Sequence, residues 1–440
     1  MPDSEIEVPA ADRVGRRTHP LTGLVQGALW AAAVLGIGSS FLNGDGWGRP
    51  PVWVGVLAAL VGGLGIGFLS WWFTRYVIDD TELRIDRGVL TRTSRRIPFE
   101  RIQSVDIAEP FVARLVGLAE LRIDMAGGDE SRSTLRLLSL DDARATRRLL
   151  LELAHGRSAT GASDGDASGD LDKETLIARV PPGRVVLGAL LSVDLLAALG
   201  ALGVLVLASV GVNEPLVLFG GVLPVLSWAA RIVGKRVVAQ WDFSLHRTPR
   251  GLRIERGLFS RTSQTIPFER VQGVAVEEPI VWRRFAWRRL EVDVAGYAAH
   301  TSDDVTATSS TLLPIADASL TAAVVRELTN AGLDVPHTRV PRRALWFAPV
   351  GWRYRWIGAD ESVAVASRGW VNRRTSVVPH AKAQSVLLRQ GPWQRRLGLA
   401  TVEVHSPDGP VDVEVHHLEL DDATTFVAAE LDRARAARRG

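Results

Sequence analysis

Residues 95–105 read RRIPFERIQSV, and a closely similar stretch, QTIPFERVQGV, returns at residues 264–274. A third version, SVVPHAKAQSV, occupies residues 376–386. Extended outward, residues 83–105 align without gaps on residues 252–274, with 15 of 23 positions identical. The copies lie too far apart for a solenoid, so the sequence predicts three separate domains built on one repeated unit.

Each copy continues in the same way along the chain. Strand-like segments with alternating apolar and polar residues follow the motif, and an amphipathic stretch then opens on an acidic residue: Asp141, Asp317 and Asp421. A carboxylate at that place can cap a helix and favours the positive end of the helix dipole. Strands followed by one closing helix predict an α+β repeat whose helix covers an open end or face of an antiparallel sheet.

Long polar side chains mark the turn inside the motif. Pro98 cannot donate to a sheet ladder, so we expect it at a strand end or edge, and we expect Gly88 and Gly257 in equivalent tight turns. The polar residues that follow the proline are Arg101, Gln103, Arg270, Gln272, Lys382 and Gln384. We expect them to bond backbone groups at the strand end, and a binding role is the alternative.

Four apolar runs interrupt the repeats, at residues 21–42, 51–73, 184–210 and 216–233. The first has no formal charge over 22 residues. At about 1.5 Å per residue, such a run crosses a hydrocarbon core of ~30 Å. Buried core helices are one alternative, and a cleaved signal peptide is another for the first run. The lengths favour four transmembrane helices arranged as two hairpins.

Basic residues indicate the orientation of these hairpins. Arg13, Arg16 and Arg17 precede the first run, and Lys235 and Arg236 close the fourth, whereas the loops inside the hairpins carry few cations. Cationic flanks stay in the cytoplasm, so both hairpin loops are expected outside, with the N-terminus and all three repeats inside. The net charge of +3 suits an anionic inner leaflet. The expected location is the cell inner membrane.

These observations give a domain map. It consists of a cytoplasmic tail (1–20), a first transmembrane hairpin (21–73), a first repeat (74–155), a flexible linker (156–179), a second hairpin (180–235), a second repeat (236–332), a short linker (333–343) and a third repeat (344–440). The flexible linker is rich in Gly, Ser and Asp, which is typical of a tether.

The pattern RGxxxRxxxxIPFxRIQ, the closing helix and the preceding apolar pair resemble the membrane-anchored bacterial pleckstrin-homology-like proteins of the YdbS/YdbT type. The resemblance covers nearly the whole chain and implies that each repeat is a pleckstrin-homology-like (PH-like) β-barrel or sandwich closed by a C-terminal helix. The family name suggests headgroup binding, but residues 78–83 (IDDTEL) and 357–362 (IGADES) are acidic and repel phosphate. Only the loop HRTPRG at residues 246–251 is basic, so we do not expect inositide recognition by all three repeats.

Catalysis and metal binding have little support in the sequence. The chain contains no cysteine, which excludes disulfides, thiolate zinc sites and iron–sulfur clusters. His405, His416 and His417 flank a predicted turn, so two of them could face each other across the strands. No further ligand for such a pair can be identified, so no metal is expected. We predict no catalytic residue, no cofactor and no enzyme activity.

An aromatic and basic stretch in the second repeat, residues 281–290, reads VWRRFAWRRL. Tryptophan prefers the headgroup zone and arginine the anionic leaflet, so a membrane-surface patch is the expectation. Its residues are Trp282, Arg283, Arg284, Trp287, Arg288 and Arg289. Ordinary core aromatics beside solvated arginines are the alternative, and nucleic-acid binding is not expected behind a membrane hairpin.

Asp194 lies ten residues beyond Arg184. This places it about 15 Å along a helix and near mid-bilayer, where an ionisable group is a functional candidate. The leading expectation is nevertheless a non-enzymatic integral membrane protein whose three cytoplasmic repeats form a docking or assembly surface. Its partners would be the lipid bilayer and other membrane or cytoplasmic proteins, with self-association included. The alternative is a transporter or channel-like component that uses Asp194.

Overall fold

The computed structural model describes residues 16–17, 52–73, 75–79, 81–87, 93–125, 132–156, 174–212, 215–249, 251–295, 311–407 and 409–439. The chain divides into two compact bodies. The N-terminal body comprises Met1–Ser168 together with Phe259–Thr265. The C-terminal body comprises Gly169–Leu258 and Ile266–Gly440.

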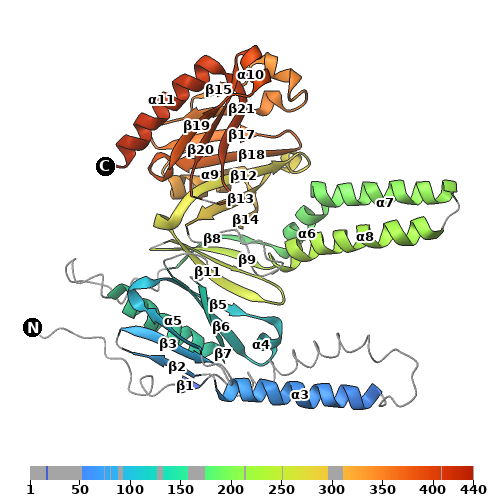
Figure 1. Ribbon diagram of the computed structural model, residues 1–440, viewed down its shortest axis with the longest axis vertical. Coiled ribbons are helices and arrows are strands. Elements are labelled where there is room, and N and C mark those ends of the chain that lie inside the picture. The colour runs from blue at the N-terminus through green and yellow to red at the C-terminus, as the bar shows by residue number, and fades with distance from the viewer. Residues whose placement is uncertain are drawn as a thin grey trace, which may run out of the picture. The chain divides into compact units, whose positions relative to one another are not determined.

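The first repeat lies in the N-terminal body. The strands β1 (Arg16–Arg17), β2 (Arg75–Ile78), β3 (Glu82–Arg87) and β4 (Thr93–Pro98) form an antiparallel sheet in that order. A 3-10 turn (Phe99–Arg101) leads to β5 (Ile102–Glu109), α4 (Phe111–Leu115), β6 (Leu118–Met125), β7 (Arg132–Ser139) and the closing helix α5 (Leu140–Gly156). Figure 1 labels these elements.

The core of this repeat lies where both sets of strands meet the closing helix. Buried side chains come from the first sheet, from β5 and β6, and from α5: Leu83, Ile97, Ile107, Leu121 and Leu150. On the far side of β5 lies the start of β11 (Arg261–Pro267), with Arg261 opposite Glu109 and Ser263 opposite Ile107. A strand numbered with the second repeat therefore completes the sheet of this body.

The second repeat begins the C-terminal body. Its elements are β8 (Thr175–Val180), α6 (Pro182–Leu190), α7 (Val193–Val212), α8 (Pro215–Val233), a π-helical turn (Gly234–Val238), β9 (Phe243–Thr248), β10 (Gly251–Arg256), the end of β11, a 3-10 turn (Phe268–Arg270), β12 (Val271–Pro279), a 3-10 turn (Trp282–Phe285), β13 (Trp287–Val294), β14 (Thr311–Asp317) and α9 (Ala318–Thr329). Figure 1 shows α7 and α8 side by side, projecting from the sheets of this body.

The third repeat completes the C-terminal body. It contains β15 (His337–Arg339), two 3-10 turns (Arg342–Trp346 and Trp352–Tyr354), β16 (Trp356–Ala359), β17 (Val363–Arg368), β18 (Asn372–Pro379), a 3-10 turn (His380–Lys382), β19 (Ser385–Arg389), α10 (Pro392–Leu397), β20 (Leu399–His405), β21 (Val413–Glu419) and α11 (Leu420–Ala437). The body holds a seven-stranded sheet in the order β14-β13-β12-β18-β17-β16-β15 and a three-stranded sheet in the order β19-β20-β21.

The structure confirms the local interpretation of the repeated motif. In all three copies a strand ends at the proline, Pro98, Pro267 or Pro379, and a 3-10 turn follows. Gly257 and Gly369 have φ of 117° and 91°, which glycine adopts readily, so the tight turn is present in the second and third repeats. Gly88 lies outside the described residues. The α+β, PH-like character predicted for the repeats is also present.

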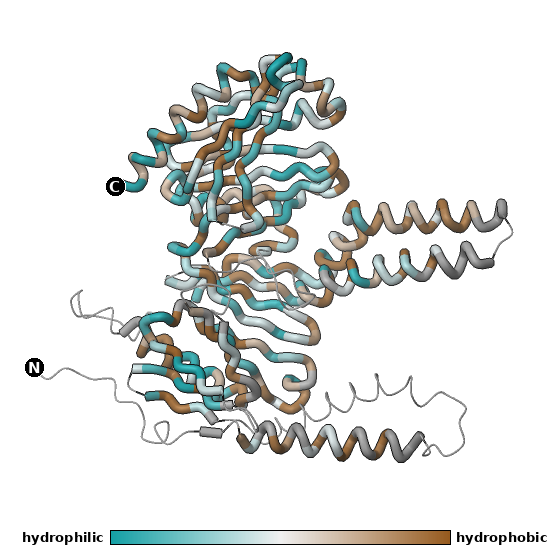
Figure 2. Tube along the Cα trace, in the orientation of Figure 1, coloured by the Kyte–Doolittle hydropathy of each residue, from teal (hydrophilic) through white to brown (hydrophobic). Residues whose placement is uncertain are grey.

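The two predicted transmembrane hairpins are not confirmed by the described helices. Among the residues with described side chains, no single helix has the length and apolar composition of a membrane span, whereas α6 and α7 up to Ala208, bent by 47°, have them together. Residues 21–42 lie outside the described residues, and α3 (Val52–Trp72) covers the second predicted run. Figure 2 shows hydrophobic residues recurring along α7. The two transmembrane hairpins therefore stay a prediction.

The sequence analysis predicted one helix for the third apolar run, and this prediction is wrong. It breaks after Leu190, and α7 begins at Val193. The Ser192 hydroxyl accepts a hydrogen bond from the backbone N–H of Leu195 (3.3 Å), so a new helix N-terminus forms there. Asp194 consequently lies in the first turn of α7 rather than inside a longer helix.

Candidate functional site

The second and third repeats are joined by backbone pairing between β12 and β18. Val274 lies opposite Val377 and Glu278 opposite Arg373 in an antiparallel register. On its other side β12 pairs with β13. Since every residue from Val271 to Glu277 is buried, β12 is a central strand of a sheet that runs from one repeat into the next.

Charged side chains are concentrated where β12 ends. Glu277 and Glu278 project from this central strand, and arginines of both flanking strands surround them. On the β18 side, Arg374 lies 2.6 Å from Glu277 and Arg373 lies 3.3 Å from Glu278. On the β13 side, Arg289 lies 3.6 Å from Glu277 and Arg288 lies 2.6 Å from Glu278. Opposite charges across neighbouring strands stabilise this register.

Glu291 of β13 completes this charge network, since its carboxylate lies 3.0 Å from Arg374. Burial, and then the nearby Glu277 carboxylate, raise the pKa of Glu291, while Arg374 and Arg289 oppose that rise. Burial, followed by the Arg236 charge, lowers the pKa of Arg289, and Glu277, Glu291 and Asp194 oppose the change. Neighbouring residues of a strand point to opposite faces, so the ion pairs of Glu277 and those of Glu278 form two groups, one on each face of the sheet. We call both groups together, Glu277, Glu278, Glu291, Arg288, Arg289, Arg373 and Arg374, the junction network.

The prediction of a membrane-facing patch is wrong for Trp282. This indole is 1% exposed and packs edge-on against Trp287 in the core of the second repeat. The Arg289 guanidinium lies over the Trp282 ring, 5.4 Å from its centroid. Alternation in a strand does not reveal which aromatic faces inward when a 3-10 turn precedes the strand, and here that turn directs Trp282 into the core.

The arginines of the same stretch divide between two roles. Arg288 and Arg289 belong to the junction network. Arg283 donates to the carbonyl of Glu278 (3.2 Å) and to the carbonyls of Trp370 and Val371, so it links β12 to the turn before β18. Arg284 is exposed, and the neighbouring Phe285 is 49% exposed. Of the predicted patch, Arg284 is therefore the residue left on the surface.

Asp194 has a partner that the sequence analysis overlooked. Its carboxylate forms an ion pair with Arg236, which follows α8. Arg231, in the last turn of α8, is exposed. The pair joins the first turn of α7 to the π-helical turn after α8, at the base of the helical hairpin. The charges of Arg236 and Asp194 are among the causes that shift the pKa of Arg289, a member of the junction network.

The polar residues of the repeated motif bond mainly to backbone. Arg270 donates to the carbonyl of Ala295 at the end of β13, and Gln272 donates to the carbonyl of Arg270 (3.4 Å). The Lys382 ammonium donates to the carbonyl of Glu269 (2.8 Å), across the repeat boundary. Gln384 is exposed and its backbone N–H bonds to the carbonyl of His405. The side chains of Arg270, Gln272 and Lys382 thus bond backbone groups, whereas the Gln384 bond is made by its main chain.

Arg101 is exposed on the first repeat, and the Gln103 side chain lies outside the described residues. The three histidines do not converge. His416 lies 3.0 Å from Glu414, and His405 lies 3.5 Å from Glu403. His417 stacks on Phe347, and burial, then Arg355 and His416, lower its pKa to about 4. Within the described ranges, no three histidine or carboxylate residues are grouped to hold a metal ion.

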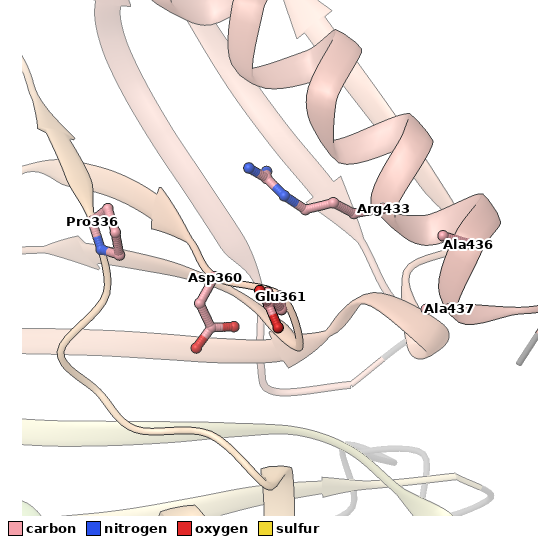
Figure 3. Close-up of a pocket in the computed structure, with 6 residues that line it drawn as sticks. All are labelled: Pro336, Asp360, Glu361, Arg433, Ala436 and Ala437. Atoms are coloured by element: carbon pink, nitrogen blue, oxygen red, sulfur yellow. The ribbon is translucent and has the colours of Figure 1, made fainter.

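The acidic loop of the third repeat borders a shallow pocket, which Figure 3 shows beside the end of α11. Its lining consists of Pro336, Asp360, Glu361, Arg433, Ala436 and Ala437. Asp360 is engaged in its own turn, where its carboxylate accepts from the N–H groups of Ser362 (2.7 Å) and Val363 (2.8 Å). Two carboxylates and one guanidinium do not make a phosphate site, as the loop composition predicts.

Beside this pocket lies a buried ion pair. His380 Nδ1 is 2.7 Å from Glu430, and both side chains are fully buried. Burial alone lowers the pKa of His380, but the hydrogen bond and charge of Glu430 outweigh burial and raise it overall. In the aligned motifs His380 stands where the second repeat has Phe268, and the sequence analysis did not identify Glu430 as its partner.

Sequence reasoning also missed an exposed apolar cluster in the third repeat. Leu345, Trp346, Phe347 and Val350 are 41%, 85%, 37% and 57% exposed, and the exposed Arg342 precedes them. The signal was present in the sequence LWFAPV at residues 345–350, which lies directly after the short predicted linker. Large exposed apolar side chains grouped in this way mark contact surfaces.

Comparison with known proteins gives two findings. The chain matches the family model described as "Bacterial PH domain" over residues 27–154, 190–331 and 337–435, which is most of its length. It is also similar to the UPF0699 transmembrane protein YdbT of Bacillus subtilis (strain 168), with 24% identity over 306 residues. That alignment covers 63% of this chain and 60% of the relative.

Proposed function

The chain belongs to the bacterial PH domain family, and on that premise we propose that it is a non-enzymatic membrane protein whose PH-like repeats form a docking surface at the membrane. The similar Bacillus subtilis protein is called a transmembrane protein, which supports membrane association. In this proposal two helical hairpins anchor the chain, and the repeats lie in the cytoplasm.

The observation that carries the proposal is the β12–β18 pairing with its junction network. Its acidic and basic side chains bond to one another between two repeats rather than converging on an open cleft. Such a junction holds the second and third repeats in one fixed register, because breaking its ion pairs would leave partly buried charges without partners, which costs free energy. A fixed array of domains is suited to binding proteins along its length.

The membrane itself is the second proposed partner. Arg284, Phe285 and the cluster of Leu345, Trp346, Phe347 and Val350 place aromatic and basic groups on the surface of the C-terminal body. Trp and Phe prefer the headgroup boundary, and arginine is attracted to anionic lipids. We assign the membrane-surface role to these residues in place of the buried Trp282.

The rival function is transport through Asp194. Its ion pair with Arg236 at the base of the hairpin supports an anchoring role, since a carboxylate already neutralised by a guanidinium needs no transported ion. In D194N the amide oxygen can still accept a hydrogen bond from Arg236. We therefore expect D194N to insert into the membrane and accumulate like the wild type.

The test compares the wild type with D194N in two assays. In liposomes that contain a pH-sensitive dye, both proteins should give no proton flux above protein-free liposomes. From native membranes in mild detergent, both should co-purify the same proteins in comparable amounts. Flux through the wild type that D194N removes would replace docking by transport. A wild-type chain that retains no protein in stoichiometric amount would contradict docking.

A further inference from the structure

Two strand junctions in this protein have the same register. In the C-terminal body, Arg373 lies opposite Glu278 and Thr375 opposite Val276. In the N-terminal body, Arg261 lies opposite Glu109 and Ser263 opposite Ile107. The repeat alignment makes Arg261 equivalent to Arg373, and Glu109 equivalent to Glu278. The same two edges of the repeat have therefore paired twice, residue for residue.

The side chains at the two junctions also share one chemistry. The inner strands end alike, as VDIAEP at residues 105–110 and VAVEEP at residues 274–279. Each glutamate before the proline faces an arginine of the partner strand. A contact between equivalent residues flanks each charge pair: the Phe111 and Phe259 rings meet edge to face with centroids 5.3 Å apart, and the backbone N–H of Ile280 donates to the carbonyl of Val371.

The strand β4 is the first-repeat equivalent of β11 and β18. It ends the described four-stranded sheet, whereas β11 and β18 each pair with the inner strand of another repeat. Thr93, Ser94 and Arg96 are exposed along it. The sequence at residues 92–94 is RTS, the same letters as residues 261–263 at the start of β11, and Arg92 itself lies outside the described residues. Among the described strands, none pairs with this edge of β4.

A second copy of this chain does not supply that partner. Its third repeat would offer β19, where the residues equivalent to Glu277 and Glu278 are Arg389 and Gln390. Placed against β4 in the same register, Arg389 would face Thr93 in a strand that already carries Arg95 and Arg96, and neither Arg389 nor Gln390 supplies a carboxylate. Like charges on neighbouring strands destabilise a pairing, so β19 and β4 are mismatched.

We propose that β4 binds a strand from a different protein chain. This partner strand is the inner strand of a PH-like repeat, and it ends in Glu-Pro as the sequences of β5 and β12 do. The strand would add antiparallel to the outer edge of β4, with the apolar residue two positions before its last glutamate opposite Ser94. The inference rests on the proposed docking function and names the partner of one edge.

The absence of cysteine allows a direct test by disulfide formation. The full-length protein carrying S94C is mixed, in detergent and a glutathione redox buffer, with a peptide copying residues 271–279 that carries V276C. In the proposed register these two cysteines lie opposite each other, where cross-strand Cα distances of about 4.5–5.5 Å permit a disulfide. We expect a mixed disulfide between protein and peptide.

Two matched peptides define the specificity. A peptide with cysteine at the position of Ala275 presents its thiol on the opposite face of the strand and should not react. A V276C peptide that also carries E277K and E278K should give a yield lower by about fivefold or more, because attraction to the β4 arginines becomes repulsion. Equal yields from all three peptides, or no product from any, would overturn the proposal.

A second mixture tests the excluded occupant. Chains with S94C are mixed with chains carrying L388C, since Leu388 of β19 is equivalent to Val276. We expect no disulfide-linked dimer, and efficient dimer formation would replace the proposal by head-to-tail self-assembly. The failure of every cross-link at β4 would remove this edge as the docking site, whereas the docking function itself fails only if the co-purification described above finds no partner.

Discussion

His380 and Glu430 replace an apolar pair that the other two repeats keep. The residue after the motif proline is Phe99 in the first repeat, Phe268 in the second and His380 in the third. Counted from the first residue of each closing helix, the eleventh residue is Leu150, Leu328 and Glu430, respectively. Each phenylalanine lies in the same hydrophobic cluster as the leucine of its repeat. The two substitutions are therefore coupled in space.

This coupling predicts a pH-dependent stability for the third repeat. The pKa of His380 is raised above its ordinary value of 6.5, so folding favours the protonated ring. The stability from this shift is fully present below pH 6.5 and is lost as the pH rises through the folded-state pKa. Thermal unfolding of the wild type should occur at lower temperature at pH 8 than at pH 6.

The double variant H380F/E430L should lose this difference. It should also be at least as stable as the wild type, because replacing a buried ion pair by apolar residues is neutral or stabilising by about 1–4 kcal/mol. H380F alone should destabilise by about 3–5 kcal/mol, since the buried Glu430 would lose its hydrogen-bond partner and keep only the partly exposed Arg433, 3.8 Å away. An unchanged pH dependence in the double variant would show that another group is responsible.

At the residue scale the sequence predicts the backbone better than the side-chain partners. The prolines and glycines of the motif act on their own φ angles, so Pro98 and Gly257 have the expected places. The partner of Asp194, Arg236, lies 42 residues away, and its identity depends on how two helices meet. The burial of Trp282 likewise depends on a 3-10 turn that periodicity does not reveal.

At the scale of elements, alternation in the sequence predicts the strands and helices within a repeat, but it does not predict how strands of different repeats pair. Strands, closing helices and the turn of the motif were predictable because each depends on nearby residues. The pairing of β12 with β18 joins strands about a hundred residues apart, and no local pattern in the sequence predicts the contact between Glu277 and Arg374. The long apolar run that splits into α6 and α7 hides a capping serine, Ser192, which hydropathy alone does not indicate.

The β12–β18 junction predicts a strong effect for R374A. The variant leaves Glu277 and Glu291 close together without their shared cation, and truncating one partner of such a pair costs about 2–5 kcal/mol. The free energy of unfolding of the full chain in detergent provides the measurement. The exposed Arg395 of α10 supplies the control, since R395A should change stability by less than about 0.5 kcal/mol. Equal effects of the two variants would contradict the junction's role.

The turn between β17 and β18 gives another prediction. At Gly369 a Cβ atom would lie 2.1 Å from the carbonyl oxygen of Asn372, and φ is +91°. G369A should therefore destabilise the protein by more than about 1 kcal/mol. Gly351 has no atom within 4 Å of an added Cβ, so G351A should be tolerated. Thermal unfolding of both variants decides the matter, and a harmless G369A would mean that the turn rearranges freely.

For the whole molecule, topology is the first quantity to measure. Reporter fusions at Gly46 and Asn213 should report the outside, whereas fusions after Gly156 and Gly440 should report the cytoplasm. The basic flanks of the apolar runs provide the physical reason, because translocating several arginines is unfavourable. A cytoplasmic reporter signal at Gly46 would reverse the proposed orientation.

Contact between the repeats and the lipid surface is a separate prediction. In a chain without cysteine, W346C can be labelled at a single site with an environment-sensitive dye. In liposomes with anionic lipid, the emission should shift to shorter wavelength relative to detergent, since the cluster around Trp346 should enter the headgroup region. A label at the exposed Asp422 is the control and should shift little. Equal shifts at both sites would remove this cluster from the membrane-surface role.

The shared register of the β5–β11 and β12–β18 pairings has a consequence for how such proteins evolve. The inner strands of the first two repeats each end in a glutamate, and each of these glutamates faces an arginine in the outer strand of the following repeat. Tandem gene duplication therefore copies a complete junction along with the domain, and a newly inserted repeat needs no compensating mutations in its neighbours. In β19 the two glutamates are replaced by Arg389 and Gln390, so this strand lacks the acidic residues that would pair with the outer strand of a further repeat. By this rule, restoring them would permit the lineage to lengthen its array by one domain.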